Sequence, residues 1–189
     1  MTKKEIAVNA VQALKKEYPD AICSLVYTDP LQLLIATRLA AQCTDARVNM
    51  ITPALFERFP TLESFAAAKV GDVEEYVRSC GFYHGKARDL VWQAQRITEV
   101  YGGKVPDNMD DLLTLPGVGR KSANLIMGDV FGKPAIVTDT HCIRLVNRMG
   151  LVDGEKDPKK VEMALWKIIP PEEGSDLCHR LVYHGRDVC

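Results

Sequence analysis

The sequence predicts an all-α protein, and three observations support this. Nearly every segment repeats its apolar residues at a helical period, and no segment shows the sustained alternation of a strand. Capping residues, glycines and prolines divide the chain into pieces of helix length. Hydrophobic residues make up 47% and charged residues 26% of the 189 residues, a balance typical of a globular protein with a sizeable core.

The helices expected in the first half of the chain follow from local signals. Thr2 and Glu5 form a capping-box pattern that starts a helix ending near residue 19. Asp29-Pro30 combines an N-cap with a first-turn proline and starts a helix that reaches about Gln42. Further helices are expected around the apolar stripe 48–59, bent at Pro53, over 61–68 and 71–80, and along 87–101, which Gly102-Gly103 closes.

Between helices expected at about 108–114 and 120–131, a proline and two glycines predict a tight hairpin. Pro116 stops the first helix, and Gly117 and Gly119 let the backbone turn without a Cβ in the way. Exposed amides there, with the positive end of the next helix, form a site for an oxygen anion such as a DNA phosphate. A plain helix–helix turn is the alternative, and Arg120-Lys121 directly behind the turn favours DNA. Helices near 140–149, 158–169 and 173–186 complete the chain.

Lys121 and Asp139 are a candidate catalytic pair. Lys121 is expected about one turn inside its helix, where the helix dipole and Arg120 disfavour the protonated amine and burial would add to this. A neutral lysine can attack a sugar C1′ or a carbonyl, and Asp139, at the start of another helix, can manage its proton. Each residue also has a plainer interpretation, as a surface lysine touching phosphate and as a helix N-cap. Only their combination favours catalysis.

Charge, cysteine content and hydropathy limit the functional class. The net charge of −1 argues mildly against nucleic acid, yet residues 78–148, which include the hairpin, hold ten Lys/Arg against seven Asp/Glu. The six cysteines form no close pair, so no disulfide framework is expected. No apolar run reaches the roughly 20 residues of a membrane span, and the N-terminus is unlike a secretory signal. A cytoplasmic protein is therefore expected.

Further motifs accompany the hairpin and Asp139, in order along the chain. They are the segments Leu39-Ala40-Ala41-Gln42-Cys43-Thr44-Asp45, Gly81-Phe82-Tyr83-His84-Gly85-Lys86-Ala87, Val105-Pro106, and His184-Gly185-Arg186 with Cys189. With these motifs the chain resembles, over essentially its whole length, the endonuclease III family of bifunctional DNA glycosylases and AP lyases in the helix–hairpin–helix superfamily.

The resemblance implies two helical lobes with a DNA-binding cleft between them. One lobe would comprise residues 23–134 and carry the helix–hairpin–helix motif at about 108–131. The second would comprise residues 1–22 plus 135–189. The family acts on double-stranded DNA with damaged bases or abasic sites, and the resemblance implies a prokaryotic monomer that associates with the nucleoid when acting.

The resemblance also implies roles for individual residues. Lys121 would be the Schiff-base nucleophile, and Asp139 the carboxylate that orients or deprotonates it. Gln42 and Phe82 would fill the gap left by a flipped nucleotide and wedge the opposite strand; the family more often has an aliphatic residue at the second position. Taken alone, the first of these is a helix-end amide and the second a loop anchor. The remaining expected contacts are Gly117, Gly119 and Arg120 to phosphates, His84 to DNA, and Asp45 and His141 around the pocket.

The expected reaction is excision of an oxidised pyrimidine followed by β-elimination. The sequence does not fix the lesion, because close relatives act on thymine mismatches and ultraviolet dimers. Family members hold a [4Fe–4S] cluster with four cysteines. Cys189 matches the first of these and is the last residue, so this chain cannot complete the cluster. We interpret the chain as a fragment of a longer protein that holds the cluster, rather than a branch that has lost it.

Three other interpretations stay open. A monofunctional adenine glycosylase usually lacks a lysine at the position of Lys121 and carries a longer C-terminal domain. A non-catalytic helix–hairpin–helix module would bind duplex DNA without forming a covalent intermediate. A plain helical scaffold would show no salt-dependent affinity for DNA.

Overall fold

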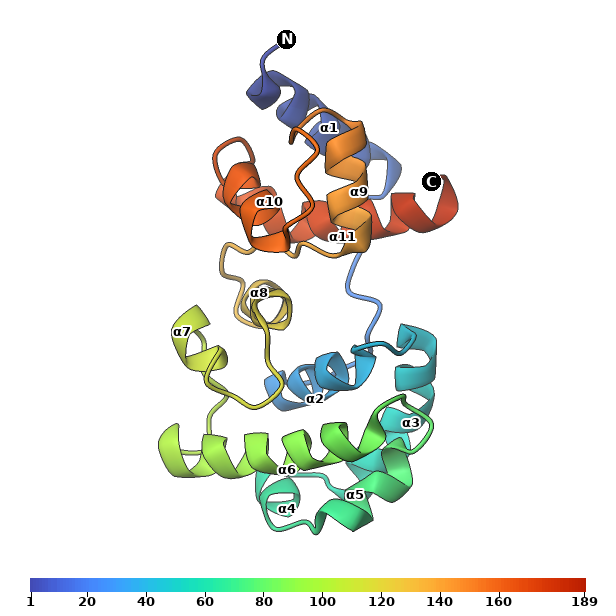
Figure 1. Cartoon of the computed structure of the whole chain (residues 1–189), viewed down its shortest axis with the longest axis vertical. Helices are drawn as coiled ribbons and strands as arrows, with labels where there is room; N and C mark the ends of the chain where they lie inside the picture. The colour runs from blue at the N-terminus through green and yellow to red at the C-terminus, as the bar shows by residue number, and fades with distance from the viewer. The chain divides into compact units, whose positions relative to one another are not determined.

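The computed structural model describes residues 1–189 and consists of helices joined by turns and loops, with no strand (Figure 1). This confirms the all-α prediction. No helix is long and apolar enough to cross a membrane. The α-helices are α1 (Lys3–Glu17), α2 (Pro30–Ala40), α3 (Asp45–Arg58), α4 (Leu62–Ala66), α5 (Val70–Val77), α6 (Tyr83–Val100), α7 (Met109–Leu112), α8 (Arg120–Asp129), α9 (Thr140–Arg148), α10 (Pro158–Leu165) and α11 (Gly174–Asp187), the last preceded by a 3₁₀ turn, η1 (Pro171–Glu173).

Local capping signals placed the helix starts well. The Thr2 hydroxyl accepts the backbone N–H of Glu5, and the Glu5 carboxylate accepts that of Thr2, which confirms the capping box. Asp29 accepts the N–H of Gln32 at 2.9 Å and starts α2. Several helices end earlier than predicted. Helix α2 stops at Ala40 because Gln42 adopts a left-handed backbone, with φ of 54°, which cannot continue a right-handed helix.

The chain forms two compact units. Unit 1 comprises Met1–Cys23 and Met127–Cys189, and unit 2 comprises Ser24–Ile126. The sequence placed the second boundary at 134/135, whereas the structure places it inside α8. The reason lies in contacts within unit 1, because Asp129 Oδ1 accepts hydrogen bonds from Ser175 and His179, and a Cβ on Gly128 would overlap Ser175.

Helix α6 is the centre of unit 2. It contacts α2 on one side and α4 and α5 on the other (Figure 1). An apolar stripe along α6 that includes Leu90 and Ile97 is buried against these helices. The largest side chains fully buried in unit 2 include Leu34, Leu55, Phe65 and Leu112.

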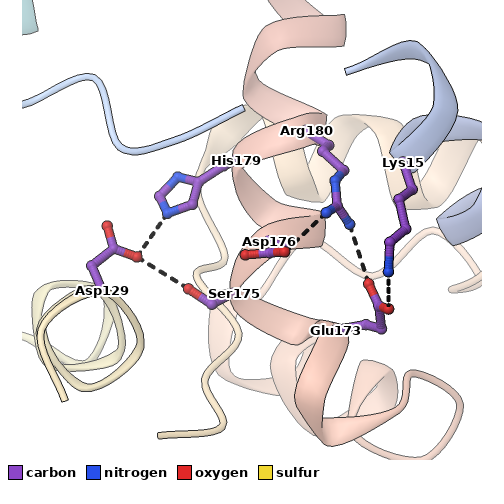
Figure 2. A network of polar contacts seen from close by, with 7 residues as sticks. All are labelled: Lys15, Asp129, Glu173, Ser175, Asp176, His179 and Arg180. Carbon is purple, nitrogen blue, oxygen red and sulfur yellow. Dashed lines mark hydrogen bonds and ion pairs between the residues drawn. The ribbon is translucent and has the colours of Figure 1, made fainter. Parts of the chain in front are cut away.

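Helix α11 organises unit 1, where it contacts α1 and α9. Figure 2 shows Arg180, only 4% exposed, donating to Glu173 and Asp176, while Lys15 of α1 donates to the same Glu173 carboxylate at 2.9 Å. The Lys15 hydrogen bond, with a smaller contribution from Arg180, holds the pKa of Glu173 below its usual value. These ion pairs fix the first helix of the chain to the last.

Candidate functional site

The predicted hairpin forms between α7 and α8. The N–H of Val118 donates to the carbonyl of Leu115 at 3.1 Å and closes the turn. Gly117 has φ of 72°, and a Cβ there would overlap Arg38 and Asp89. Position 117 therefore requires glycine for two reasons: its φ is positive, and a Cβ would overlap Arg38 and Asp89. Gly117 and Gly119 are both exposed, so the turn presents its backbone at the surface.

Polar side chains of α2 and α6 pack against the hairpin. The Arg38 guanidinium of α2 pairs with Asp89 Oδ2 of α6, with Nη2 at 2.7 Å and Nε at 2.8 Å. One turn along α6, Gln93 donates its side-chain N–H to the carbonyl of Pro116 at 2.6 Å. Asp89 and Gln93 are 7% and 1% exposed. We call Arg38, Asp89 and Gln93 the hairpin seat.

The hairpin seat was not predicted from the sequence. Asp89 and Gln93 lie four residues apart, beside the apolar stripe of a long helix, where polar residues usually face solvent. The sequence offered one weak indication, because both residues stand next to apolar residues of the buried stripe. A polar side chain at such a position can turn inward if another helix or loop supplies a hydrogen-bond partner.

Lys121 lies in the first turn of α8, directly behind the hairpin. Its side chain is exposed, so burial does not contribute to its environment. Arg120 is half-buried beside it, while Ala123, Asn124 and Ile126 are buried and anchor the helix. The lysine amine is thus presented to solvent from a fixed helix start.

Asp139 is the N-cap of α9, in unit 1. Its Oδ1 accepts the N–H of Cys142 at 2.7 Å. The plainer interpretation of this residue as a helix cap is therefore realised. The cap uses one carboxylate oxygen and fixes the direction of the other.

The two expected pocket residues have partners inside their own units. The His141 ring lies 3.2 Å from Arg144, which also donates to the carbonyl of Gly185 at 3.0 Å. A Cβ on Gly185 would overlap the His141 ring, so α11 fixes this side chain. Asp45 begins α3 and accepts the hydroxyl of Ser24 at 2.7 Å.

Gln42 and Phe82 share a rare backbone state. They are the two non-glycine residues of the chain with positive φ, 54° and 58°. Such a conformation costs about 1–3 kcal/mol and persists only where its surroundings impose it. Both side chains are exposed, and Phe82 is 75% exposed, unusual for a phenylalanine.

The loops that carry these two residues lie side by side within unit 2. The thiols of Cys43 and Cys80 are 3.5 Å apart, and a Cβ on Gly81 would lie 3.7 Å from the carbonyl oxygen of Gln42. The structure thus brings together two predicted site residues that are forty positions apart in the sequence. His84 follows the second loop and pairs with Glu74 at 2.8 Å.

None of the six cysteines forms a disulfide. Cys189 is exposed, and its sulfur accepts a hydrogen bond from Arg148. No group of three or more His, Cys, Asp or Glu side chains could hold a metal ion.

Comparisons with known proteins identify the family of this chain. Residues 35–171 match the family of HhH-GPD superfamily base excision DNA repair proteins. Endonuclease III of Synechocystis sp. is 46% identical over 100% of this chain and 86% of its own length. Endonuclease III of Bacillus subtilis is 40% identical over 91% of this chain and 78% of its own length.

Solved structures show the same likeness. A non-covalent endonuclease III–DNA complex superimposes with a TM-score of 0.94 at 42% identity, covering 100% of this chain and 88% of that one. A trapped endonuclease III–DNA covalent intermediate gives 0.92 at 42% identity, covering 98% and 87%. A thermostable thymine-DNA glycosylase, at 21% identity and a TM-score of 0.83, shares the fold.

Proposed function

Because this chain belongs to the endonuclease III family of HhH-GPD base excision repair proteins, we propose that it excises oxidised pyrimidines through Lys121 and then cuts the strand. The chain is a DNA glycosylase of base excision repair that acts on double-stranded DNA. The residue roles, the lesion class and the lyase step that follow are our proposal.

The feature that supports the proposal most is the placement of Lys121. A glycosylase that forms a Schiff base needs its amine within reach of the sugar whose phosphates it grips. Lys121 stands in the first turn of α8, two residues after an exposed glycine of the hairpin. The amine and the proposed phosphate site therefore lie within one short segment of the chain.

Binding begins at the hairpin. The backbone amides at Gly117 and Gly119, with Arg120 behind them, hold phosphates next to the lesion and position the duplex without reading its sequence. By the likeness to the family, His84 would add a contact to DNA, and Asp45 and His141 would line or support the pocket for the damaged nucleotide.

Extrusion of the damaged nucleotide follows. Flipping costs a few kcal/mol and is cheapest at a weakened base pair. Gln42 fills the gap in the stack, and the Phe82 ring wedges the opposite strand. Their exposure on neighbouring loops suits this joint action.

The covalent step uses the neutral amine of Lys121. Its nitrogen attacks C1′, the glycosidic bond breaks, and the base leaves with the bonding electrons and takes up a proton. Asp139 accepts the proton that the nitrogen loses, through the carboxylate oxygen not used for the cap. The deoxyribose ring then opens, which leaves an imine between C1′ and Nζ of Lys121. Removal of a C2′ proton then expels the 3′ phosphate by β-elimination, and water hydrolyses the imine.

We further propose that the protein is a cytoplasmic monomer. A [4Fe–4S] cluster would use Cys189 as one of its ligands.

Borohydride trapping tests the proposal. Reduction during incubation with a duplex that contains an abasic site or thymine glycol should give a covalent protein–DNA complex. Lys121→Ala should abolish the complex while keeping affinity for the duplex, because the hairpin is unchanged. Binding by the unaltered protein without any trapping would instead indicate a non-catalytic DNA-binding module.

A further inference from the structure

Lys86 is a buried cation that the proposed chemistry does not use. It lies in the first turns of α6, and only 1% of its surface is exposed. Burial lowers the pKa of this ammonium group. A buried lysine is rare and destabilising unless its charge is satisfied, so its contacts indicate its role.

The side chain of Lys86 holds the end of α2. Its Nζ donates to the carbonyl oxygen of Leu39 at 2.8 Å. This carbonyl belongs to the last turn of α2, where helix carbonyls lack backbone partners and a cation is favoured. Gln42 follows three residues later, so Lys86 fixes the point from which the Gln42 loop leaves its helix.

The backbone of Lys86 holds the other loop. Its N–H donates to the carbonyl of Phe82 at 3.2 Å, in the first turn of α6. One residue is therefore bonded to the segments that carry both left-handed residues. The paired thiols of Cys43 and Cys80 lie between the same two segments. We call Lys86, Cys43 and Cys80 the loop junction.

Lys86 cannot act on the substrate directly, because its ammonium group is enclosed and bonded to a backbone carbonyl. Its effect must pass through the residues it holds. Two side chains that enter one gap in a base stack need a fixed spacing, and a preorganised pair loses less conformational entropy on binding.

We propose that Lys86 is a positioning residue for nucleotide flipping, which locks the Gln42 and Phe82 loops at the spacing needed to fill the gap and wedge the opposite strand. This inference rests on the proposed function, since it assumes that these two side chains enter the DNA. It adds a buried residue to the machinery of flipping and leaves the chemistry at Lys121 unchanged.

The test uses Lys86→Met, which keeps the length of the side chain and removes its charge and donor. Lys104→Met is the matched control, because Lys104 is an exposed lysine of the same unit and the variant loses the same charge. The probe is a duplex with a stable abasic analogue opposite 2-aminopurine, whose fluorescence rises when the base loses its stacking. The undamaged duplex is measured in parallel.

In the unaltered protein and in Lys104→Met, saturating protein should raise the fluorescence to the same level. In Lys86→Met the rise should be at least halved. Affinity for the abasic duplex should fall about tenfold, because loops that are no longer held in place must be ordered on binding. Affinity for undamaged duplex should change less than about twofold. Lys86→Arg, which keeps the charge and the donor, should restore most of the signal.

A purely structural role would have a different signature. It would lower the melting temperature and the affinity for both duplexes together, and the saturated complex would keep its full fluorescence; that result overturns the proposal. If Lys86→Met does not fold, Lys86→Gln, whose shorter amide cannot reach the Leu39 carbonyl, is read by the same criteria. Absence of borohydride trapping in the unaltered protein would count against the proposed function instead.

Discussion

The hairpin and the pair of loops at Gln42 and Phe82 both use left-handed backbone, but they use it differently. The hairpin places a glycine at its positive φ, where the conformation is unstrained. The loops place side chains at theirs and accept the strain. In the proposed function a phosphate is bound through backbone N–H groups, so the hairpin needs no side chain there. A gap in a base stack must be filled, so the loops do.

The two regions also differ in the contacts that hold them in place. The hairpin rests on an ion pair and an amide, Arg38–Asp89 and Gln93, which hold one turn. The loops are held by one buried lysine, whose Nζ bonds to the Leu39 carbonyl at the end of α2 and whose backbone N–H bonds to the Phe82 carbonyl at the start of α6. We infer that loss of the hairpin seat weakens binding to every duplex, whereas loss of the loop junction weakens binding to damaged duplex alone.

The largest expected effect comes from Gly117→Ala. The new Cβ overlaps the Arg38–Asp89 pair and meets a positive φ, so the free energy of unfolding should fall by about 3 kcal/mol or more. Affinity should fall alike for damaged and undamaged duplex. Denaturant unfolding and binding titrations measure both, and Gly119→Ala, where a Cβ meets nothing within 4 Å, is the matched control. Equal stability of the two variants would contradict the close packing of Gly117 against the hairpin seat.

Asp89→Asn tests the seat without altering the hairpin itself. It leaves the half-buried Arg38 guanidinium without its carboxylate, which should cost about 2 kcal/mol of stability. Binding should weaken equally for both duplexes, and trapping at saturating protein should proceed at the usual rate. A loss confined to damaged DNA would show that the two regions are not separable.

Phe82→Gly sharpens the contrast, because stability and function should move in opposite directions. Glycine relieves the left-handed strain, so stability should be unchanged or rise by up to about 1 kcal/mol. Preference for damaged over undamaged duplex should fall because the wedge is absent. Thermal unfolding with competition binding measures both. Marked destabilisation would show that the ring packs in the free protein.

The smallest expected effect lies in unit 1, which contains neither region. The pKa of Glu173 is lowered in the folded protein, so its stabilising contribution is present above the unfolded pKa and is lost as pH falls through the folded value. Lys15→Met should therefore reduce stability at neutral pH and flatten its acid dependence. Affinity for DNA at neutral pH should stay the same. Unfolding curves from pH 7 down to about 3 test this, and an unaltered acid dependence would contradict it.

Local sequence determined much of this protein. The caps at Thr2 and Asp29, the hairpin and the lysine behind it were predictable because each depends on residues within a few positions of one another. Helix ends were less predictable. Helix α2 was expected to reach Gln42, and the left-handed state that ends it depends on the neighbouring loop.

The tertiary structure alone decided which polar residues turn inward. Asp89, Gln93 and Lys86 lie on α6 among other polar residues, such as Arg88, that stay exposed. What distinguishes them is a partner contributed by a distant segment: Arg38, the Pro116 carbonyl and the Leu39 carbonyl. The helical period of the sequence shows which face of α6 is apolar. Whether a polar group beside that face meets water or a carbonyl depends on chain packing, because only packing brings the partner within hydrogen-bonding distance.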